Sequence, residues 1–340
     1  MASRSDEIRR FLIQAIDRGD SPSLVRAASE KFDISRQAVN RHLRQLVDEG
    51  VVEGSGNTKN RRYVLKGLAH EMSPFHLSGE LQEDQVWRTN VRPVLDDVQE
   101  NVIGICQYGF TEILNNAIDH SEGRLTTVEV YRTAARITIG IYDNGVGIFN
   151  KIKRELHLDD ERHAILELSK GKLTTDPARH TGEGVFFVSR VFDQFSIISG
   201  DLFFGSQDTG DWLLDRAERS QGTYVVMEIS VFSHRTLKEV FDQFASDQSD
   251  YGFSKTHLKV SLARYGDENL VSRSQAKRLL TRLDRFKEIV FDFETVDTIG
   301  QAFADEIFRV FQNEHPDILL SWVNGTTEVT QMIMRARSQT

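Results

Sequence analysis

The segment DNGVGI occupies residues 143–148 of this 340-residue chain. It follows residues 137–142, where apolar side chains alternate as in a half-buried strand. Gly145 and Gly147 permit close backbone approaches that a Cβ would block. Asp143 therefore stands at a strand end, where its carboxylate can accept hydrogen bonds from a ligand with an amino group, such as adenine. Many turns read Asp-Asn-Gly, so the flanking sequence decides the meaning of this segment.

Upstream, residues 99–120 follow a helical pattern that ends in FTEILNNAIDH at 110–120. On a helical wheel, one arc holds the polar side chains of Glu112, Asn116, Asp119 and His120. Asparagine is a poor helix former, and a solvated helix face normally carries Lys, Glu or Gln instead. This polar strip therefore favours chemistry over mere solvation. A Glu carboxylate can orient and deprotonate a water, and an Asn oxygen can complete a Mg²⁺ shell.

Downstream, HTGEGVFFVSRVFD at 180–193 places Gly182 and Gly184 at the start of a predicted helix. The free amides and the dipole of a helix N-terminus bind phosphate. Further on, Gly222 and Thr223 precede an apolar strand at 224–229.

The order of these three motifs resembles the GHKL ATPase superfamily over roughly residues 85–232. The resemblance implies an α/β sandwich (the Bergerat fold) that binds ATP and Mg²⁺, with residues 149–181 as the ATP lid. It also implies a role for each matching residue. Glu112 is the general base, Asn116 ligates Mg²⁺, and Asp143 accepts a hydrogen bond from the adenine amino group. The other expected cofactor-binding residues are Asp119, Gly145, Gly147, Thr181, Gly182, Gly184 and Thr223.

Residues 1–66 predict three helices, at 6–18, 23–31 and 36–49, followed by a hairpin. Ser35 is a good N-cap for the third helix. This order resembles the winged helix-turn-helix family, whose third helix reads the major groove. A small helical protein-interaction module is the alternative. The residues expected to contact DNA are Arg36, Gln37, Asn40, Arg41 and Arg44 on the helix and Lys59, Arg61 and Arg62 in the wing.

Charge supports this division. Residues 1–66 carry a net +4 and the rest of the chain −13, within a total of −9. A basic small domain on an acidic body places any contact with double-stranded DNA in the first 66 residues.

Residues 250–340 alternate strand and helix, as in a small α/β domain. The segment FDFETVDTIGQAFADEIF at 291–308 resembles STAS domains, the anti-anti-sigma type. Phosphorylated STAS domains carry an Asp-Ser-Ser/Thr-Gly loop, but here Ile299 fills the usual acceptor position. A phosphorylation switch is therefore in doubt, and Asp297 or Thr298 is expected to cap the following helix.

Residues 67–82 are expected to be a linker before an ATP-binding domain at 83–235. Within the linker, HEMSP at 70–74 looks like the phospho-acceptor box of histidine kinases. Those kinases place the box on a long helix, which Pro74 and the Ser78-Gly79 pair would break.

The whole chain is therefore expected to be an α+β multidomain protein. Cys106 is its single cysteine, which excludes an internal disulfide framework and fits a reducing cytoplasm. No apolar run approaches the roughly 20 residues of a membrane span, and the N-terminus lacks a signal-peptide core. The expected location is cytoplasmic, without a membrane partner.

The predicted function is a DNA-binding regulator in which Mg-ATP controls the binding of DNA or of a protein partner through the STAS-like domain. The alternative is a serine/threonine protein kinase like the anti-sigma-factor kinases, acting on a STAS or other partner. A nucleotide switch that does not hydrolyse ATP is the third interpretation. A homodimer would suit a reader of two half-sites, although no residue pattern specifies it.

Overall fold

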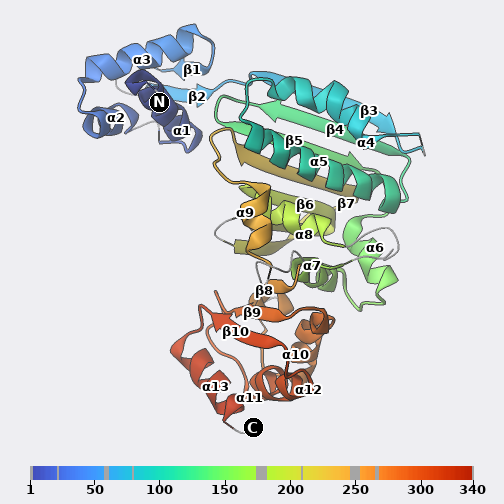
Figure 1. Cartoon of the computed structure of the whole chain (residues 1–340). Helices are drawn as coiled ribbons and strands as arrows, with labels where there is room; N and C mark the ends of the chain where they lie inside the picture. Colours follow the sequence, from blue (N-terminus) through green and yellow to red (C-terminus); the bar gives the residue numbers. More distant parts are fainter. Residues whose placement is uncertain are drawn as a thin grey trace.

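The computed structural model describes residues 3–20, 23–56, 61–78, 80–173, 182–207, 210–245, 253–264 and 268–338. Figure 1 shows three parts that follow one another along the chain: a small helical domain, a central domain built on the largest sheet, and a C-terminal domain. The fold is therefore α+β, as the sequence predicts.

The N-terminal domain has the predicted three helices and hairpin. Ser35 caps the third helix, because its hydroxyl accepts a hydrogen bond from the Ala38 amide at 3.2 Å. Val39, Leu43 and Leu46 form the buried face of that helix. The elements are α1 (Arg4–Asp17), α2 (Leu24–Phe32), α3 (Arg36–Asp48), β1 (Val52–Ser55) and β2 (Arg62–Leu65).

The central domain is an antiparallel five-stranded sheet in the order β3-β4-β5-β7-β6. Its strands are β3 (Ala69–His76), β4 (Leu125–Arg132), β5 (Arg136–Asp143), β6 (Gln194–Gln207) and β7 (Gly210–Ser230). Helix α5 (Glu100–His120) packs on β5 and β7, and α8 (Gly184–Val191) packs on α5 and β6. Smaller helical elements complete the domain: α4 (Glu83–Val86), η1 (Trp87–Val91), η2 (Arg92–Leu95), α6 (Ile148–Glu155), α7 (Glu161–Lys170) and α9 (Leu237–Asp242).

The segment expected to be a linker contains a strand instead. Residues 69–76 form β3, which pairs with β4 along its whole length. Pro74 lacks an amide donor, yet an edge strand tolerates it because only one side of that strand is paired. His70 lies on this strand, with its Nε2 2.8 Å from Glu129 Oε1. It is not on a helix, as the phospho-acceptor box of a histidine kinase would be.

The C-terminal domain has a parallel three-stranded sheet in the order β10-β9-β8. The predicted N-cap of helix α11 (Gln301–Asp305) was wrong. Gly300 is the N-cap residue, Thr298 is exposed, and the Asp297 carbonyl accepts a hydrogen bond from the Thr326 hydroxyl at 2.7 Å. The elements are β8 (Lys255–Lys259), η3 (Val260–Ala263), α10 (Arg273–Leu280), η4 (Leu283–Arg285), β9 (Glu288–Asp292), α11 (Gln301–Asp305), η5 (Glu306–Phe311), α12 (Gln312–Glu314), β10 (Leu319–Val323) and α13 (Thr327–Arg337).

Two hydrophobic cores hold the described residues together. One runs without interruption from the central sheet into the C-terminal domain. The other fills the N-terminal domain and also takes in Ala134, Ala135 and Phe232 of the central domain. Among the helices described, none combines the length and the apolar character that crossing a membrane requires.

Two glycines of α5 provide a matched test of this packing. A Cβ at Gly109 would lie 2.3 Å from the Phe192 ring, whereas a Cβ at Gly104 would meet no atom within 4 Å. We expect Gly109→Ala to lower the free energy of unfolding by about 1–3 kcal/mol through overpacking. Gly104→Ala should raise it by about 0.5–1 kcal/mol, because alanine loses less backbone entropy in a helix. Urea unfolding measures both, and a destabilisation by Gly104→Ala equal to that of Gly109→Ala would contradict this packing.

Candidate functional site

A cavity of about 300 Å³ opens between α5, the DNGVGI turn, α7 and the start of α8. Side chains from segments far apart in the sequence meet in it. The predicted site residues that line it are Glu112, Asn116, Asp143, Gly147, Gly182, Gly184 and Thr223. Its volume lies at the lower end of the range for small-molecule sites, about 300–1,000 Å³.

Asp143 ends β5 at the inner end of the cavity and is only 6% exposed. Its Oδ1 accepts a hydrogen bond from the Gly145 amide at 2.8 Å. Burial raises the pKa of Asp143, although hydrogen bonds from Gly145 and Thr223 partly oppose that shift. Each carboxylate oxygen can accept more than one hydrogen bond, so Asp143 retains the capacity to accept one from a ligand amino group.

Thr223 is the direct neighbour of Asp143 on β7. Its hydroxyl oxygen accepts a hydrogen bond from the Ile148 amide at 3.0 Å. Because Ile148 is the first residue of α6, Thr223 links the inner end of the cavity to that helix. The predicted proximity of Asp143 and Thr223 is therefore present in the structure.

Gly145 does not line the cavity but makes the turn possible. A Cβ at this position would lie 2.0 Å from the Ser121 carbonyl oxygen. The same carbonyl accepts a hydrogen bond from the Val146 amide at 2.9 Å. The absence of a side chain at Gly145 thus lets the turn pack directly on the end of α5.

Glu112 and Asn116 are half-buried on α5, which packs on the strand that carries Asp143, and both line the cavity. A Cβ at Gly184 would lie 2.0 Å from Glu112 Oε2. The Glu112 carboxylate therefore touches the first turn of α8. Only glycine leaves room for that contact.

The first turn of α8 combines free amides with nearby acidic groups. Its N-cap residue is Glu183, which makes no side-chain cap hydrogen bond. Burial raises the pKa of Glu183, with Lys172 opposing the shift. Burial also raises the pKa of Tyr108, and the carboxylates of Glu112 and Glu183 raise it further. An anion bound here would meet a helix N-terminus, but it would also need a cation to offset these carboxylates.

Some predicted site residues are not placed at the cavity or at the DNA-binding surface by the described part of the chain. Asp119 is exposed near the end of α5 and does not line the cavity. Thr181 lies outside the residues that the structure describes, as does Lys59 of the wing.

The structure also adds residues that sequence reasoning missed. Lys151 of α6 lines the cavity, and its amine donates to Glu122 Oε1 at 2.5 Å. Its position four residues after Gly147, in the first turns of a helix, could have indicated it. Leu168 and Leu173 also line the cavity, but they come from the presumed lid, for which the sequence predicted no helix.

A second cleft, of about 800 Å³, lies at the carboxyl edge of the C-terminal sheet. Burial opposes ionisation of Asp292 there, but hydrogen bonds from His257, the Glu294 amide and Asn324 hold its pKa at about 2. Arg190 pairs with Asp211 and Lys259 with Glu294 inside the cleft, and Arg235, which also lines it, pairs with Asp193. These pairs satisfy one another, so the cleft indicates no particular ligand.

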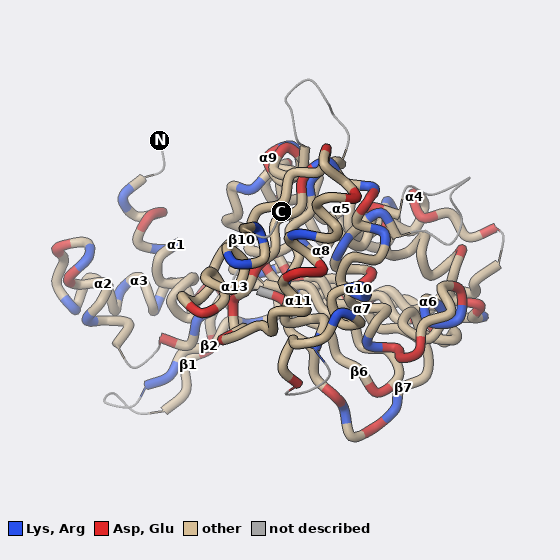
Figure 2. Tube along the Cα trace, turned by 90° about the horizontal axis from the view of Figure 1, so that it is seen from below, with Lys and Arg blue, Asp and Glu red and all other residues tan. Residues whose placement is uncertain are grey.

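The candidate nucleic-acid surface lies at the other end of the molecule. Arg36, Gln37, Arg41 and Arg44 are exposed on α3, and Asn40 is half-exposed between them. Arg61 and Arg62 are exposed at the start of β2. Figure 2 shows the Lys and Arg positions along these helices and the hairpin.

Comparison with known families identifies the two outer domains. Residues 6–53 match the winged helix-turn-helix DNA-binding family, and residues 275–330 match a STAS-like domain of unknown function. The chain is thus a DNA-binding protein with a STAS-like domain. No family model of a GHKL ATPase matches the middle region, and no curated protein matches the chain.

Asp143→Asn tests the electrostatics of the cavity. Burial raises the pKa of Asp143 in the folded protein above 3.8, its ordinary value. The free energy of unfolding of the wild type therefore falls as the pH rises from 3.8 through the folded-state pKa. This loss of stability is still present at pH 7. The neutral amide removes this cost, and its oxygen can still accept from the Gly145 amide. We expect the urea midpoint of the variant at pH 7 to equal or exceed that of the wild type. A clearly lower midpoint would show that the ionised carboxylate stabilises the fold.

Proposed function

We propose that this protein is a DNA-binding regulator whose central domain binds Mg-ATP, and that nucleotide state alters DNA binding. The observation that carries this proposal is the convergence of Asp143, Glu112, Asn116 and the start of α8 in one cavity. Three separate segments, β5, α5 and the start of α8, would supply an adenine acceptor, a base with a metal ligand, and a phosphate cradle. The resemblance of these motifs to GHKL ATPases supports the same assignment.

The residues fit the parts of the nucleotide as follows. The buried Asp143 carboxylate, next to Thr223, would accept a hydrogen bond from the adenine amino group. The first turn of α8 would hold phosphate oxygens, and Lys151 would face the same cavity as a cation. The nucleotide would thus extend from the inner end of the cavity towards Gly182 and Gly184.

The donor set suits Mg²⁺ held together with phosphates. Among the described residues, no group of three or more His, Cys, Asp or Glu could hold a metal alone. Mg²⁺ usually takes one or two protein oxygens and completes its shell with phosphates and waters. Asn116 supplies such an oxygen, and the acidic surroundings of Glu112 and Glu183 favour a cation. Bound Mg²⁺ would offset phosphate charge, while Glu112 would orient a water and accept its proton.

Contacts between the central domain and the winged helix support coupling to DNA binding. Arg136 begins β5, and its guanidinium pairs with Asp17 of α1 at 2.8 Å and with Glu228 at 2.7 Å. Arg10 of α1 donates to the Phe232 carbonyl at 3.0 Å and lies over the Phe232 ring. The DNA-binding domain is thereby fixed to the central sheet.

Strand β5 joins these contacts to the cavity. It runs from Arg136 at the winged helix to Asp143 at the inner end of the cavity. At about 3.3 Å per residue, its two ends lie about 23 Å apart. A change of strand position at Asp143 would therefore reach the domain that contacts DNA.

Nucleotide binding is the direct test of the site. A fluorescent ATP analogue with Mg²⁺ should bind the wild type, and Asp143→Asn should weaken binding by about tenfold or more, as expected for loss of a hydrogen bond to a charged group. Equal affinity of the two proteins for the analogue would show that Asp143 does not bind the nucleotide. With γ-labelled ATP, free phosphate indicates hydrolysis, whereas label on an added protein would favour the kinase alternative. Ile299, which is 5% exposed, offers no hydroxyl for transfer within the chain.

Asp17→Ala tests the coupling. It removes the ion pair to Arg136 but leaves Asp143 and the DNA-contacting helix unchanged. We expect nucleotide affinity to be retained and the nucleotide dependence of DNA affinity to shrink, measured by fluorescence anisotropy with no nucleotide, ADP and a non-hydrolysable analogue. The control is Asp20→Ala, whose carboxylate pairs with Arg18 inside the winged helix. Coupling that is unchanged in Asp17→Ala, or lost equally in the control, would rule out this route.

A further inference from the structure

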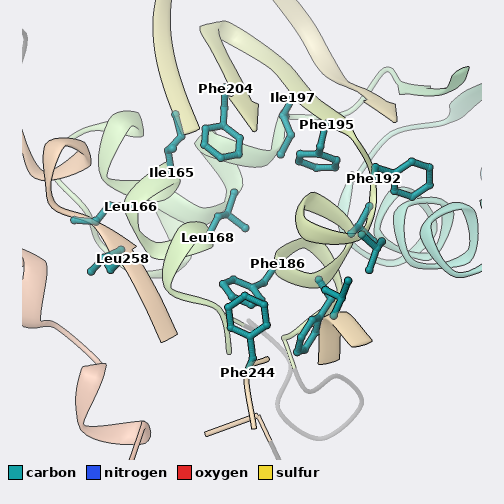
Figure 3. Close-up of a cluster of buried hydrophobic side chains, with 14 of the residues drawn as sticks. Ile165, Leu166, Leu168, Phe186, Phe192, Phe195, Ile197, Phe204, Phe244 and Leu258 are labelled. Carbon is teal, nitrogen blue, oxygen red and sulfur yellow. The ribbon is translucent and has the colours of Figure 1, made fainter. Parts of the chain in front are cut away.

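Helix α7 lies between the cavity and the STAS-like domain. Leu168 lines the cavity, while Leu166 lies beside Leu258 of β8 in the C-terminal domain (Figure 3). The helix packs against β8 and η3 as well as against α6 and α8. It belongs to the segment expected to be the ATP lid, residues 149–181, of which residues 149–173 are described; these are called the lid segment below.

The end of α7 is anchored by a buried lysine. The Lys170 side chain is 2% exposed and pairs with Glu167, which is 5% exposed. The Lys170 amine also donates to the carbonyl oxygens of Arg278 at 3.1 Å and Thr281 at 2.9 Å. Those carbonyls belong to the C-terminal end of α10, where a positive charge is favourable. Thr256 of β8 donates to the Lys170 carbonyl at 2.8 Å.

The cost of burying this charge makes the contact specific. Burial lowers the pKa of Lys170, and Arg282 lowers it further, whereas Glu167 raises it. A buried charge that loses its partners is strongly unfavourable. Lys170 therefore holds one position of the lid segment firmly, as long as the end of α10 stays in place.

The two residues after Lys170 also contact the STAS-like domain. Gly171 has a φ of +80°, and a Cβ there would lie 2.4 Å from the Phe253 ring. Lys172 donates to the Arg285 carbonyl at 3.1 Å, and Arg282 donates to the Lys172 carbonyl at 3.2 Å. One residue later, Leu173 returns to the cavity, and its amide donates to the Gly182 carbonyl at 2.9 Å.

Helix α8 is joined to the STAS-like domain as well. Phe186 lines the cavity. The centroid of its ring lies 4.7 Å from the ring centroid of Phe253 and 5.0 Å from that of Phe244. Phe253 in turn contacts Phe286 at 5.3 Å. Figure 3 shows Phe186 and Phe244 facing each other below Leu168. The start of α8 and the end of α7 thus pack on one aromatic cluster.

Within its own domain, α7 combines apolar packing on α6 and α8 with ion pairs that are exposed to solvent. Arg162 pairs with Asp215 of β7, and Glu161 pairs with Arg219. Asp215 and Arg219 are 65% and 64% exposed, so solvent screens both pairs. Exposed ion pairs contribute about 0–1 kcal/mol each. The buried polar contacts that join α7 to another domain, at Lys170, are therefore made with the STAS-like domain.

We propose that the STAS-like domain controls the nucleotide site by holding the lid segment closed through the Lys170 contact with α10. Movement of α10 away from Lys170 frees α7, which opens the wall formed by Leu168 and Leu173. A protein that binds the STAS-like domain and shifts α10 would thus speed nucleotide exchange. This inference rests on the proposed ATP site, but the position of the lid can be measured without nucleotide.

The test replaces the buried pair with neutral side chains of similar size, in Glu167→Gln/Lys170→Met of the full chain. Hydrogen exchange of the α7 amides in the nucleotide-free protein should be about tenfold faster than in the wild type. Dissociation of a fluorescent ATP analogue, measured by stopped flow, should accelerate by a similar factor. Thr256→Val, which removes one hydrogen bond to Lys170, should shift both rates in the same direction by a smaller amount.

The control is Lys255→Met/Glu288→Gln, which removes a pair of the same residue types inside the STAS-like domain, 2.9 Å apart. It should change neither rate. Unchanged exchange of α7 in the test variant overturns the proposal, even if nucleotide binds. Absence of nucleotide binding in the wild type overturns the proposed function instead, and the exchange of α7 still decides whether the STAS-like domain holds the lid. If the double variant does not fold, Thr256→Val decides, and unchanged rates there overturn the proposal.

Discussion

The close approach of α5 and α8 is the constraint on which the central domain depends. Two glycine contacts set it: Gly109 of α5 lies against Phe192, and Gly184 of α8 lies against the Glu112 carboxylate. The first contact closes the hydrophobic core over the sheet, and the second forms one wall of the cavity. The packing of the domain and the shape of its site therefore share one cause. A larger side chain at either glycine would separate the helices and change both.

Much of the fold could be predicted from local sequence. Helices α3 and α5 follow from periodic apolar residues, and each lies within one residue of its predicted bounds. The resemblance of three motifs to those of GHKL ATPases implied a common site for Glu112, Asn116, Asp143 and Thr223, and these four residues line one cavity. Apolar periodicity and the separate motifs are short in range, so a single sequence is enough to display them.

The missed features depend on contacts that are distant in sequence. Strand β3 looked like a linker because Pro74 and flanking polar residues hide its pairing with β4. Helix α7 was hidden because Lys170 and Glu167 look like surface charges, and only α10 explains their burial. The expected cap at Asp297 or Thr298 was wrong because α11 begins at Gln301, so that Gly300 is its N-cap residue, and the preceding loop is bound through the Asp297 carbonyl to Thr326 at the start of α13. In each case the partner that decides the structure lies in another element.

The anchor of Lys170 also has a consequence for how the chain is made. Its carbonyl partners, Arg278 and Thr281, lie 108 and 111 residues later in the sequence. Domains generally fold in order from the N-terminus during synthesis. The winged-helix domain is therefore synthesised long before α10, whose carbonyl groups hold α7 beside the cavity. A nascent or prematurely terminated chain would carry a finished DNA-binding domain without the part that holds α7 in place.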